Sequence, residues 1–365
     1  MYKTLRPLLF KLDPETAHLQ TIYALKRVPH IPGAQWFLKQ IFAMPLKPVT
    51  VFGLYFHNPV GLAAGYDKDA IAVRGLATLG FGHIEVGTIT PLPQKGNPSP
   101  RVFRLPEDEC VINRMGFPSA GSAQVIQSLK AIGHCKNPHV KEKKVIEIHK
   151  FIPKALPKKR QTKMILGINI GKNKNTPNAE AVYDYLSLLQ LFAPCADYLT
   201  INISSPNTAG LRDLQGKRAL ESLLKELNYQ RKEEQKILRK RLPLLVKLSP
   251  DLSDEELRDA LDVILDTGMD GVIATNTTLT REGLKSAHRK ETGGMSGSKL
   301  RVKSEAVLNQ IVKHVDGKIP IVSSGGIMNP ADAKRRLELG ATLVQLYTGL
   351  IYEGPGLVKE IVKTL

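Results

Sequence analysis

Short apolar segments recur along the chain from residue 60 onward, and a longer amphipathic stretch follows each of them. The apolar segments have the length of buried strands, and the stretches behind them have the period of helices. Eight strands are expected, at residues 60–64, 83–88, 165–170, 198–204, 244–248, 271–275, 320–323 and 343–347. Eight helices are expected near residues 68–79, 118–132, 178–192, 216–240, 253–267, 301–314, 330–339 and 355–364.

Eight consecutive strand-then-helix units are the number that closes a (β/α)8 TIM barrel, so we predict an α/β protein with this fold. A doubly wound open sheet is the alternative, but it usually has fewer strands and a single glycine-rich turn after the first. Residues 49–56 precede the first unit and predict a small hairpin. A chain of 365 residues accommodates one barrel with such additions.

Residues 1–45 form a separate helical unit in front of the barrel domain, which we assign to residues 46–365. Asp13 followed by Pro14 is a helix start, with the Asp as N-cap and the Pro at the first helical position. The segment 36–42 is too apolar for a free surface helix, so it either packs on the barrel or enters a lipid interface. Lysines and arginines of this unit would contact anionic head groups.

The net charge of +18 is unevenly distributed. Residues 133–163 hold ten Lys and Arg against two Glu, and they lengthen the loop before the third strand well beyond the usual size. This basic insertion is interpreted as a solvated surface excursion, with a membrane or partner contact as the functional alternative. Without interleaved aromatic residues or a nucleic-acid-binding module, the charge does not indicate nucleic-acid binding.

The three cysteines, Cys110, Cys135 and Cys195, share no close spacing, which argues against a zinc site and against a disulfide framework. The reducing cytosol is the expected compartment. No run of about 18 apolar residues occurs, so no membrane span is expected. The first ten residues have no small-residue cleavage site and do not predict a signal peptide.

Polar residues gather where the fourth predicted strand ends. Apolar and polar residues alternate from Tyr198 to Asn202, and Pro206 cannot continue a ladder, so the strand stops near Ser205. Asn202, Ser205, Asn207 and Thr208 therefore crowd one strand end. Two amides and two hydroxyls without a charge can bind the edge of a flat heterocycle and hold a hydroxyl over it. An ordinary Ser/Asn turn is the simpler interpretation of this stretch alone.

Other strand ends indicate the class of ligand, because barrel enzymes carry their chemistry there. Gly325-Gly326 and Thr348-Gly349 follow the seventh and eighth strands, where barrels bind phosphate with backbone N–H groups. Lys247 lies in an apolar strand, and a lysine in such a place is rarely buried without a partner. Beside a flavin ring it could stabilise negative charge on the reduced form.

Five motifs together resemble the dihydroorotate dehydrogenase family, the flavin enzymes that make orotate in pyrimidine synthesis. The resemblance runs in order from about residue 5 to the C-terminus and leaves out the 133–163 insertion. The motifs are Ala64-Gly65-Tyr66-Asp67-Lys68, Asn113-Arg114-Met115-Gly116-Phe117, Gly167-Ile168-Asn169-Ile170-Gly171-Lys172-Asn173, Asn202-Ile203-Ser204-Ser205-Pro206-Asn207-Thr208 and Asn276-Thr277-Thr278.

The resemblance implies a site for each reactant and favours class 2, which has a serine base and an N-terminal helical unit associated with a membrane-bound quinone; class 1 members have a cysteine at the position of Ser205. The implied FMN-binding residues are Ala64, Gly65, Tyr66, Asp67, Lys68, Thr88, Asn169, Asn202, Lys247, Thr275, Gly297, Gly326, Tyr347 and Thr348. The implied dihydroorotate-binding residues are Lys68, Asn113, Arg114, Met115, Gly116, Phe117, Asn202, Asn207, Asn276 and Thr277. His18 and Arg104 match positions that line the quinone tunnel.

The function implied is oxidation of (S)-dihydroorotate to orotate, with Ser205 as catalytic base, one FMN per chain as hydride acceptor and a quinone as final electron acceptor. No metal is expected. We expect a monomer in peripheral contact with the cytoplasmic face of the cell membrane. The alternatives are a soluble class 1-like enzyme that uses fumarate or NAD, a flavin-free barrel acting on a phosphorylated metabolite, and a basic membrane-surface or nucleic-acid-binding protein without activity.

Overall fold

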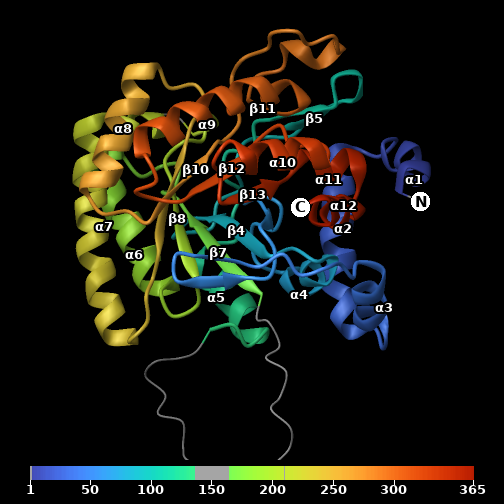
Figure 1. The fold of residues 1–365 in the computed structure, drawn as a ribbon, viewed down its shortest axis with the longest axis horizontal. Helices are drawn as coiled ribbons and strands as arrows, with labels where there is room; N and C mark the ends of the chain where they lie inside the picture. Colours follow the sequence, from blue (N-terminus) through green and yellow to red (C-terminus); the bar gives the residue numbers. More distant parts are fainter. Residues whose placement is uncertain (1, 136–163, 209) are drawn as a thin grey trace, which may run out of the picture.

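The computed structural model describes residues 2–135, 164–208 and 210–365. Its centre is a closed barrel of eight parallel strands in the order β10-β12-β13-β3-β4-β7-β8-β9 (Figure 1). The strands are β3 (Val60–Leu62), β4 (His83–Ile89), β7 (Ile165–Ile170), β8 (Tyr198–Asn202), β9 (Leu244–Leu248), β10 (Gly271–Ala274), β12 (Ile321–Ser324) and β13 (Leu343–Leu346). All eight predicted strands are therefore confirmed, and so is the (β/α)8 fold.

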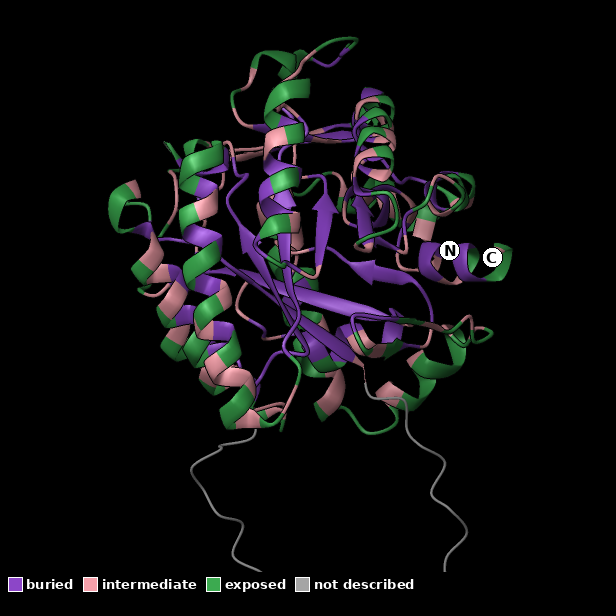
Figure 2. Cartoon of the chain, turned by 60° about the vertical axis from the view of Figure 1, so that its left-hand side comes forward, coloured by how far each residue is buried: buried purple, intermediate pink, exposed green. Residues whose placement is uncertain are grey.

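The barrel strands are buried along their whole length, and the helices around them have exposed outer faces (Figure 2). Strands covered on both sides consist of nearly continuous apolar residues. This explains why the barrel strands could be predicted from the apolar segments of the sequence. The surrounding helices are α4 (Val73–Leu76), α5 (Ser122–Ala131), α6 (Ala181–Phe192), α7 (Lys217–Leu238), α8 (Asp254–Asp266), α9 (Arg301–Val315), α10 (Pro330–Glu338) and α12 (Gly356–Thr364).

The first helix of the barrel is much shorter than predicted. The expected helix 68–79 begins only at Val73, and a short 3-10 turn completes it. The carboxylate of Asp67 accepts hydrogen bonds from the backbone N–H groups of Ile71 and Ala72, so the residues before Val73 form a loop around it. This loop carries the side chain of Lys68 to the end of the barrel.

Three helices precede the barrel: α1 (Tyr2–Leu9), α2 (Pro14–Arg27) and α3 (Ala34–Ile41). Asp13 caps α2 by accepting a hydrogen bond from Thr16 N at 2.9 Å, as the sequence predicts. Ile22 is buried in the same apolar cluster as the barrel core, so α2 is an integral wall of the structure. In the described part of the chain, no helix combines the length and the apolar character needed to cross a membrane.

Two small sheets complete the fold. The predicted hairpin at residues 49–56 is confirmed as β1 (Val49–Val51) and β2 (Leu54–Phe56). An antiparallel sheet of β5 (Val102–Leu105), β6 (Cys110–Asn113) and β11 (Gly294–Gly297) was not predicted. It joins two loops that are distant in the sequence and brings Asn113 and Ser296 to the same end of the barrel. The helix α11 (Thr348–Glu353) follows β13 directly.

The prediction that the cysteines form no disulfide is wrong for one pair. Cys135 and Cys195 are bonded, with their sulfur atoms 2.10 Å and their Cα atoms 4.2 Å apart. Helices α5 and α6 pack side by side, and each cysteine follows one of them. The two residues meet although 60 positions separate them, which spacing alone does not reveal. Cys110 is buried and free, and the basic insertion lies, after its first three residues, outside the described residues.

Gly75 allows α2 to pack closely against α4. Its replacement tests whether this packing stabilises the protein. A Cβ at Gly75 would lie 2.1 Å from the carbonyl oxygen of Leu25. We expect Gly75→Ala to lower the free energy of unfolding by about 1–3 kcal/mol and to speed proteolysis between residues 28 and 48. Unfolding in denaturant and limited proteolysis measure the two effects.

Gly356→Ala is the matched control, because Gly356 also lies in a helix and the nearest atom to an added Cβ is 4.0 Å away. Alanine is the better helix former, so this variant should be as stable as the parent or more stable by up to about 1 kcal/mol. Equal stability of both variants would show that close packing of α2 is not required.

Candidate active site

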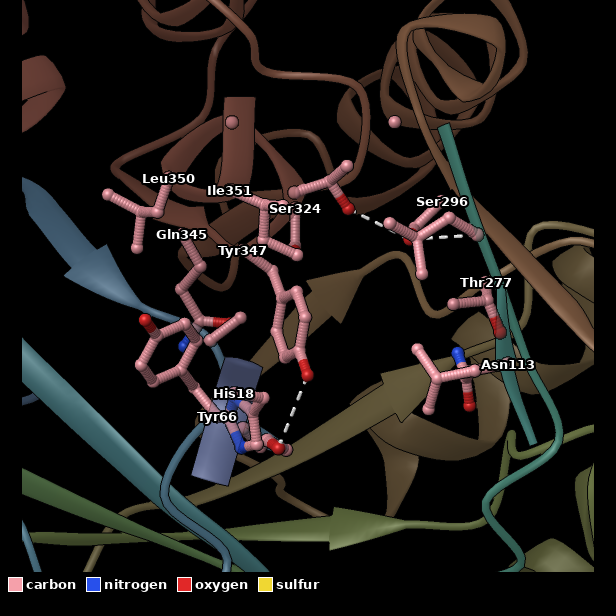
Figure 3. A pocket seen from close by; sticks show the side chains of 18 of the residues that line it. His18, Tyr66, Asn113, Thr277, Ser296, Ser324, Gln345, Tyr347, Leu350 and Ile351 are labelled. Carbon is pink, nitrogen blue, oxygen red and sulfur yellow. Dashed lines mark hydrogen bonds between the residues drawn. The ribbon is translucent and has the colours of Figure 1, made fainter. Parts of the chain in front are cut away.

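A cavity of about 500 Å³ opens at the carboxyl ends of the barrel strands. Figure 3 shows Asn113 and Thr277 on one side of it and His18 with Tyr66 on the other. Seven of the eight barrel strands contribute residues at or just beyond their ends, namely Ala63, Thr88, Asn202, Lys247, Thr275, Ser324 and Gln345. The volume is that of a site for small organic molecules.

The loop after β8 places Ser205 in the cavity wall. The Ser205 hydroxyl accepts a hydrogen bond from the backbone N–H of Asn207 at 3.2 Å, which fixes the turn that Pro206 begins. Asn207 Nδ2 in turn donates to Asn113 Oδ1 at 3.3 Å. Arg212 donates to the carbonyl oxygen of Ser204 at 3.2 Å and holds the far end of the loop. Ser205 is buried and neutral, and no carboxylate or histidine hydrogen-bonds to it among the described residues.

Lys68 is a cation of the same cavity. Its ammonium donates to the carbonyl oxygen of Gly65 at 2.8 Å, which directs it along the loop after β3. Burial lowers the pKa of Lys68 to about 8, against the attraction of Asp69 and Glu15. Lys68 is therefore protonated at neutral pH, and its charge becomes sensitive to pH just above that range.

Lys247 is the second cation in the cavity wall. It lies beside Asn202 in the parallel register of β8 and β9, so the two side chains point to the same face of the sheet. Burial lowers the pKa of Lys247, and the carboxylate of Glu85 opposes this change. A buried ammonium in a polar pocket stabilises negative charge that develops on a neighbouring ligand.

The loops after β12 and β13 form a narrow backbone-lined recess of the cavity. Gly326 has φ of +75°, and a Cβ on it would lie 2.3 Å from Cα of Arg301, so only glycine fits. The Thr348 hydroxyl donates to Ser296 Oγ at 2.8 Å beside this recess. The buried guanidinium of Arg336 donates to the carbonyl oxygen of Gly325 at 3.1 Å and holds the loop from behind. Close backbone, hydroxyl groups and a nearby cation suit a phosphate group.

The N-terminal helices close the opposite end of the cavity. The ring of His18 packs edge-on against Tyr66 with 5.1 Å between centroids, and Tyr66 packs likewise against Tyr347 at 5.7 Å. Burial, with a smaller effect of Lys68, lowers the pKa of His18 to about 3, so His18 is neutral at physiological pH. The guanidinium of Arg104 lies 4.6 Å from the ring centroid of Phe10. This end of the cavity is thus mainly aromatic and aliphatic.

The structure brings nearly all residues named from the sequence to this one cavity. Those that line it are His18, Ala64, Gly65, Tyr66, Lys68, Thr88, Arg104, Asn113, Met115, Gly116, Phe117, Asn202, Ser205, Asn207, Lys247, Thr275, Asn276, Thr277, Gly297, Gly326, Tyr347 and Thr348.

Three of the named residues, Asp67, Arg114 and Asn169, do not line the cavity. Asp67 organises the loop before α4, as described above. Arg114 pairs with Glu291 at 2.6 Å and stacks on Phe103 at 4.6 Å from the ring centroid. Asn169 lies behind Thr88 and accepts a hydrogen bond from its hydroxyl at 2.6 Å.

Several lining residues were not anticipated. Ser296 comes from the unpredicted sheet, and Gln345 faces inward from β13. The alternation of inward and outward residues along β13 was the available signal for Gln345, since a glutamine within an apolar strand needs a buried partner. Leu9, Phe10, Leu25, Leu38 and Phe42 line the N-terminal end and carry no chemical motif.

Fold and site together define an enzyme of the (β/α)8-barrel class, with a polar ligand cavity at the carboxyl ends of the strands and an apolar annex formed by added helices. The family model described as dihydroorotate dehydrogenase matches residues 47–365. The chain belongs to the dihydroorotate dehydrogenase family.

Relatives that align over the whole chain carry the name "Dihydroorotate dehydrogenase (quinone)". The protein of Idiomarina loihiensis is 45% identical over 365 residues, with 100% of both chains covered. That of Halorhodospira halophila is 43% identical, covering 100% of this chain and 97% of its own. The alignment includes the N-terminal helices, so the chain is of the quinone-dependent class 2 type.

Solved structures agree with the fold. The ligand-free enzyme of Eimeria tenella has a TM-score of 0.81 at 39% identity, covering 96% of this chain and 93% of that one. Its complex with ferulenol has a TM-score of 0.77 at 38% identity, covering 96% and 90%.

Proposed function

We propose that this protein oxidises (S)-dihydroorotate to orotate, with FMN as the hydride acceptor and a quinone as the final electron acceptor. The observation that carries the proposal is the meeting of Ser205, Lys68 and Lys247 in one cavity. A hydroxyl, a cation for a carboxylate and a cation for a reduced ring are the three groups that this reaction needs.

The substrate would lie under the loop after β8. The ammonium of Lys68 suits the carboxylate of dihydroorotate, and the amides of Asn113, Asn202, Asn207 and Asn276 suit its ring carbonyl and N–H groups. The backbone of Asn202 is fixed by the Tyr185 hydroxyl, which donates to its carbonyl oxygen at 2.8 Å. Such anchored partners hold the ring in one orientation.

The recess near Gly326 and Thr348 would hold the phosphate of FMN, and Lys247 would lie beside its ring. The glycine that leaves no room for a Cβ and the buried ammonium both fit this cofactor. Bound FMN supplies a hydride acceptor. Thr88, Thr275 and Asn202 also line the cavity and would contact the same cofactor.

Ser205 would take the proton from C5 of the substrate. A neutral serine is a weak base, so the reaction depends on negative charge spread onto a carbonyl group that Asn donors hold. The buried hydroxyl of Thr208, three residues further along the loop, has no hydrogen-bond partner within the described part of the chain, and it or a water molecule would be the next acceptor for the proton. The proton thus has an exit along the loop.

Residues 1–45 would form the quinone entrance and a peripheral contact with the cytoplasmic face of the membrane. Eleven of the 19 exposed large apolar side chains in the described part of the chain lie between Leu5 and Leu46, so this unit would supply the contact with a lipid surface. His18 and Arg104 line the passage inward. We propose a monomer with one FMN, and no metal or nucleic acid.

The flavin cofactor and the final electron acceptor can be tested on the purified protein. Purified protein should show the visible spectrum of oxidised flavin, and dihydroorotate without an acceptor should bleach it. A ubiquinone analogue should restore the spectrum faster than fumarate or NAD. A colourless protein would contradict the proposal, and faster recovery with fumarate or NAD would support the class 1-like alternative.

The role of Ser205 as catalytic base is tested by its replacement. Ser205→Ala should leave FMN bound and slow flavin reduction by dihydroorotate about 10²–10⁴-fold, measured by stopped-flow absorbance, because the proton acceptor is lost. Ser205→Cys is the matched variant, since a thiol of similar size can also accept a proton, and it should retain more activity than Ser205→Ala. Reduction by Ser205→Ala at the parental rate would exclude this role.

The role of the Lys68 charge in binding the substrate carboxylate is tested by changing the pH. Its pKa of about 8 means that the ammonium is present below this pH and lost above it. Binding of orotate, measured by calorimetry on the FMN-loaded protein, should therefore weaken about tenfold between pH 7 and pH 9. Lys68→Arg remains charged over this range and should bind independently of pH. A parental protein that binds equally at both pH values would show that Lys68 does not hold the carboxylate.

A further inference from the structure

Glu85 is a buried carboxylate that the reaction described above does not use. It lies in the middle of β4, and its side chain is completely buried in the barrel. Its Oε2 accepts hydrogen bonds from the Tyr198 hydroxyl at 3.1 Å and from Gln345 Nε2 at 2.8 Å. The hydroxyl reaches it because Gly167 has no side chain; a Cβ there would lie 2.1 Å from the Tyr198 ring. These donors satisfy a carboxyl group that would otherwise be costly to bury.

The other oxygen of Glu85 begins a chain of hydrogen bonds that ends in the cavity. Each member donates to the next member nearer the carboxylate. At the cavity, Asn276 Nδ2 donates to Ser204 Oγ at 3.0 Å, and Ser204 Oγ donates to Asn202 Oδ1 at 3.0 Å. Further inward, Asn202 Nδ2 donates to Thr88 Oγ1 at 2.8 Å, and Thr88 Oγ1 donates to Asn169 Oδ1 at 2.6 Å. At the inner end, Asn169 Nδ2 donates to Glu85 Oε1 at 2.8 Å.

The direction of this chain follows from the chemistry of its inner end. An ionised carboxylate accepts hydrogen bonds but has no proton to donate. Asn169 must therefore turn its NH2 group toward Glu85 and its carbonyl oxygen toward Thr88. The Thr88 hydroxyl uses its one proton on Asn169, so it accepts from the NH2 group of Asn202. Each member thus transmits the direction to the next.

The result is visible in Asn202 and Asn276, the two asparagines of this chain of hydrogen bonds that line the cavity. The Oδ1 of Asn202 accepts from Ser204, and the Oδ1 of Asn276 accepts from the backbone N–H of Thr277 at 2.8 Å. Both carbonyl oxygens are thus used within the protein. Each NH2 group has a second N–H besides the one in the chain, and this is the group left for a ligand.

We propose that Glu85 is a positioning residue, whose carboxylate sets the direction of the hydrogen-bond chain so that Asn202 offers an N–H donor to a ring carbonyl group of the ligand. This inference rests on the proposed function, since it takes the ligand to be a pyrimidine with such carbonyl groups. With the direction reversed, Asn202 would turn its carbonyl oxygen toward an oxygen of the ligand, and two acceptors would face each other, whereas the backbone N–H of Thr277 would keep Asn276 in place.

Glu85→Gln tests the direction directly. The Gln Oε1 can go on accepting from Tyr198 and Gln345, which places its NH2 group against Asn169 and reverses the chain. Affinities of the FMN-loaded protein for two ligands are measured by calorimetry: orotate, and the cytosine analogue of orotate, in which an amino group replaces one ring carbonyl. Orotate should bind about 10–100-fold more weakly to Glu85→Gln, while the cytosine analogue should lose little or gain affinity.

Tyr198→Phe is the matched control. It removes one donor from the same carboxylate but leaves the charge and the contact with Asn169 intact. The preference for orotate over the cytosine analogue should stay within about threefold of the parental value. A general loosening of the barrel would weaken both ligands alike in both variants, and that outcome would overturn the inference.

Thr88→Val provides a second test if Glu85→Gln fails to fold or to bind FMN. It removes the hydroxyl that connects Asn169 to Asn202 and keeps the branched shape of the side chain, so the preference for orotate should again decrease about tenfold. An unchanged preference in the variant that folds would overturn the role of Glu85. A parental protein that binds neither flavin nor orotate would instead contradict the proposed function.

Discussion

Polar groups inside a closed parallel barrel must satisfy one another, because the strands are buried on both sides and water does not reach them. This constraint governs the centre of the molecule. The buried carboxylate of Glu85 accepts hydrogen bonds from Asn169, Tyr198 and Gln345, and those side chains occupy positions where an ordinary barrel has aliphatic residues. Since Asn169 also connects to the cavity wall, the interior that stabilises the fold also orients the site.

The N-terminal helices impose a second constraint, which concerns the shape of the cavity. Helix α2 reaches the barrel because Gly75 leaves room for the backbone of Leu25 and because Ile22 joins the core. Glu15 on the same helix pairs with Arg101 at 2.6 Å, and Arg101 also donates to the carbonyl oxygen of Asn97 at 2.9 Å. The helical unit is therefore tied to loops on the substrate side, and its apolar lining is fixed relative to the polar lining.

Much of the fold could be predicted from the sequence, because buried parallel strands and amphipathic helices each leave a local signature. The loop at Asp67 shows the limit: its carboxylate binds two backbone N–H groups and delays the helix, which periodicity does not indicate. The bond between Cys135 and Cys195 and the pairing of β6 with β11 depend on contacts between distant residues. The motifs predicted most of the residues that line the cavity. They did not show that Asn169 lies behind Thr88 and does not itself face the cavity.

The two ends of the cavity differ in polarity, and this difference suits a reaction in two halves. At the β8 end, amides and hydroxyls are held by hydrogen bonds, so a polar ring is fixed in one orientation. At the helical end, His18 is neutral because burial lowers its pKa to about 3, and it packs against Tyr66 among aliphatic side chains. A charged imidazole there would disfavour an apolar ligand, whereas a neutral one can donate a hydrogen bond without that cost. An apolar oxidant and a polar substrate can therefore bind in one cavity without contacting the same side chains.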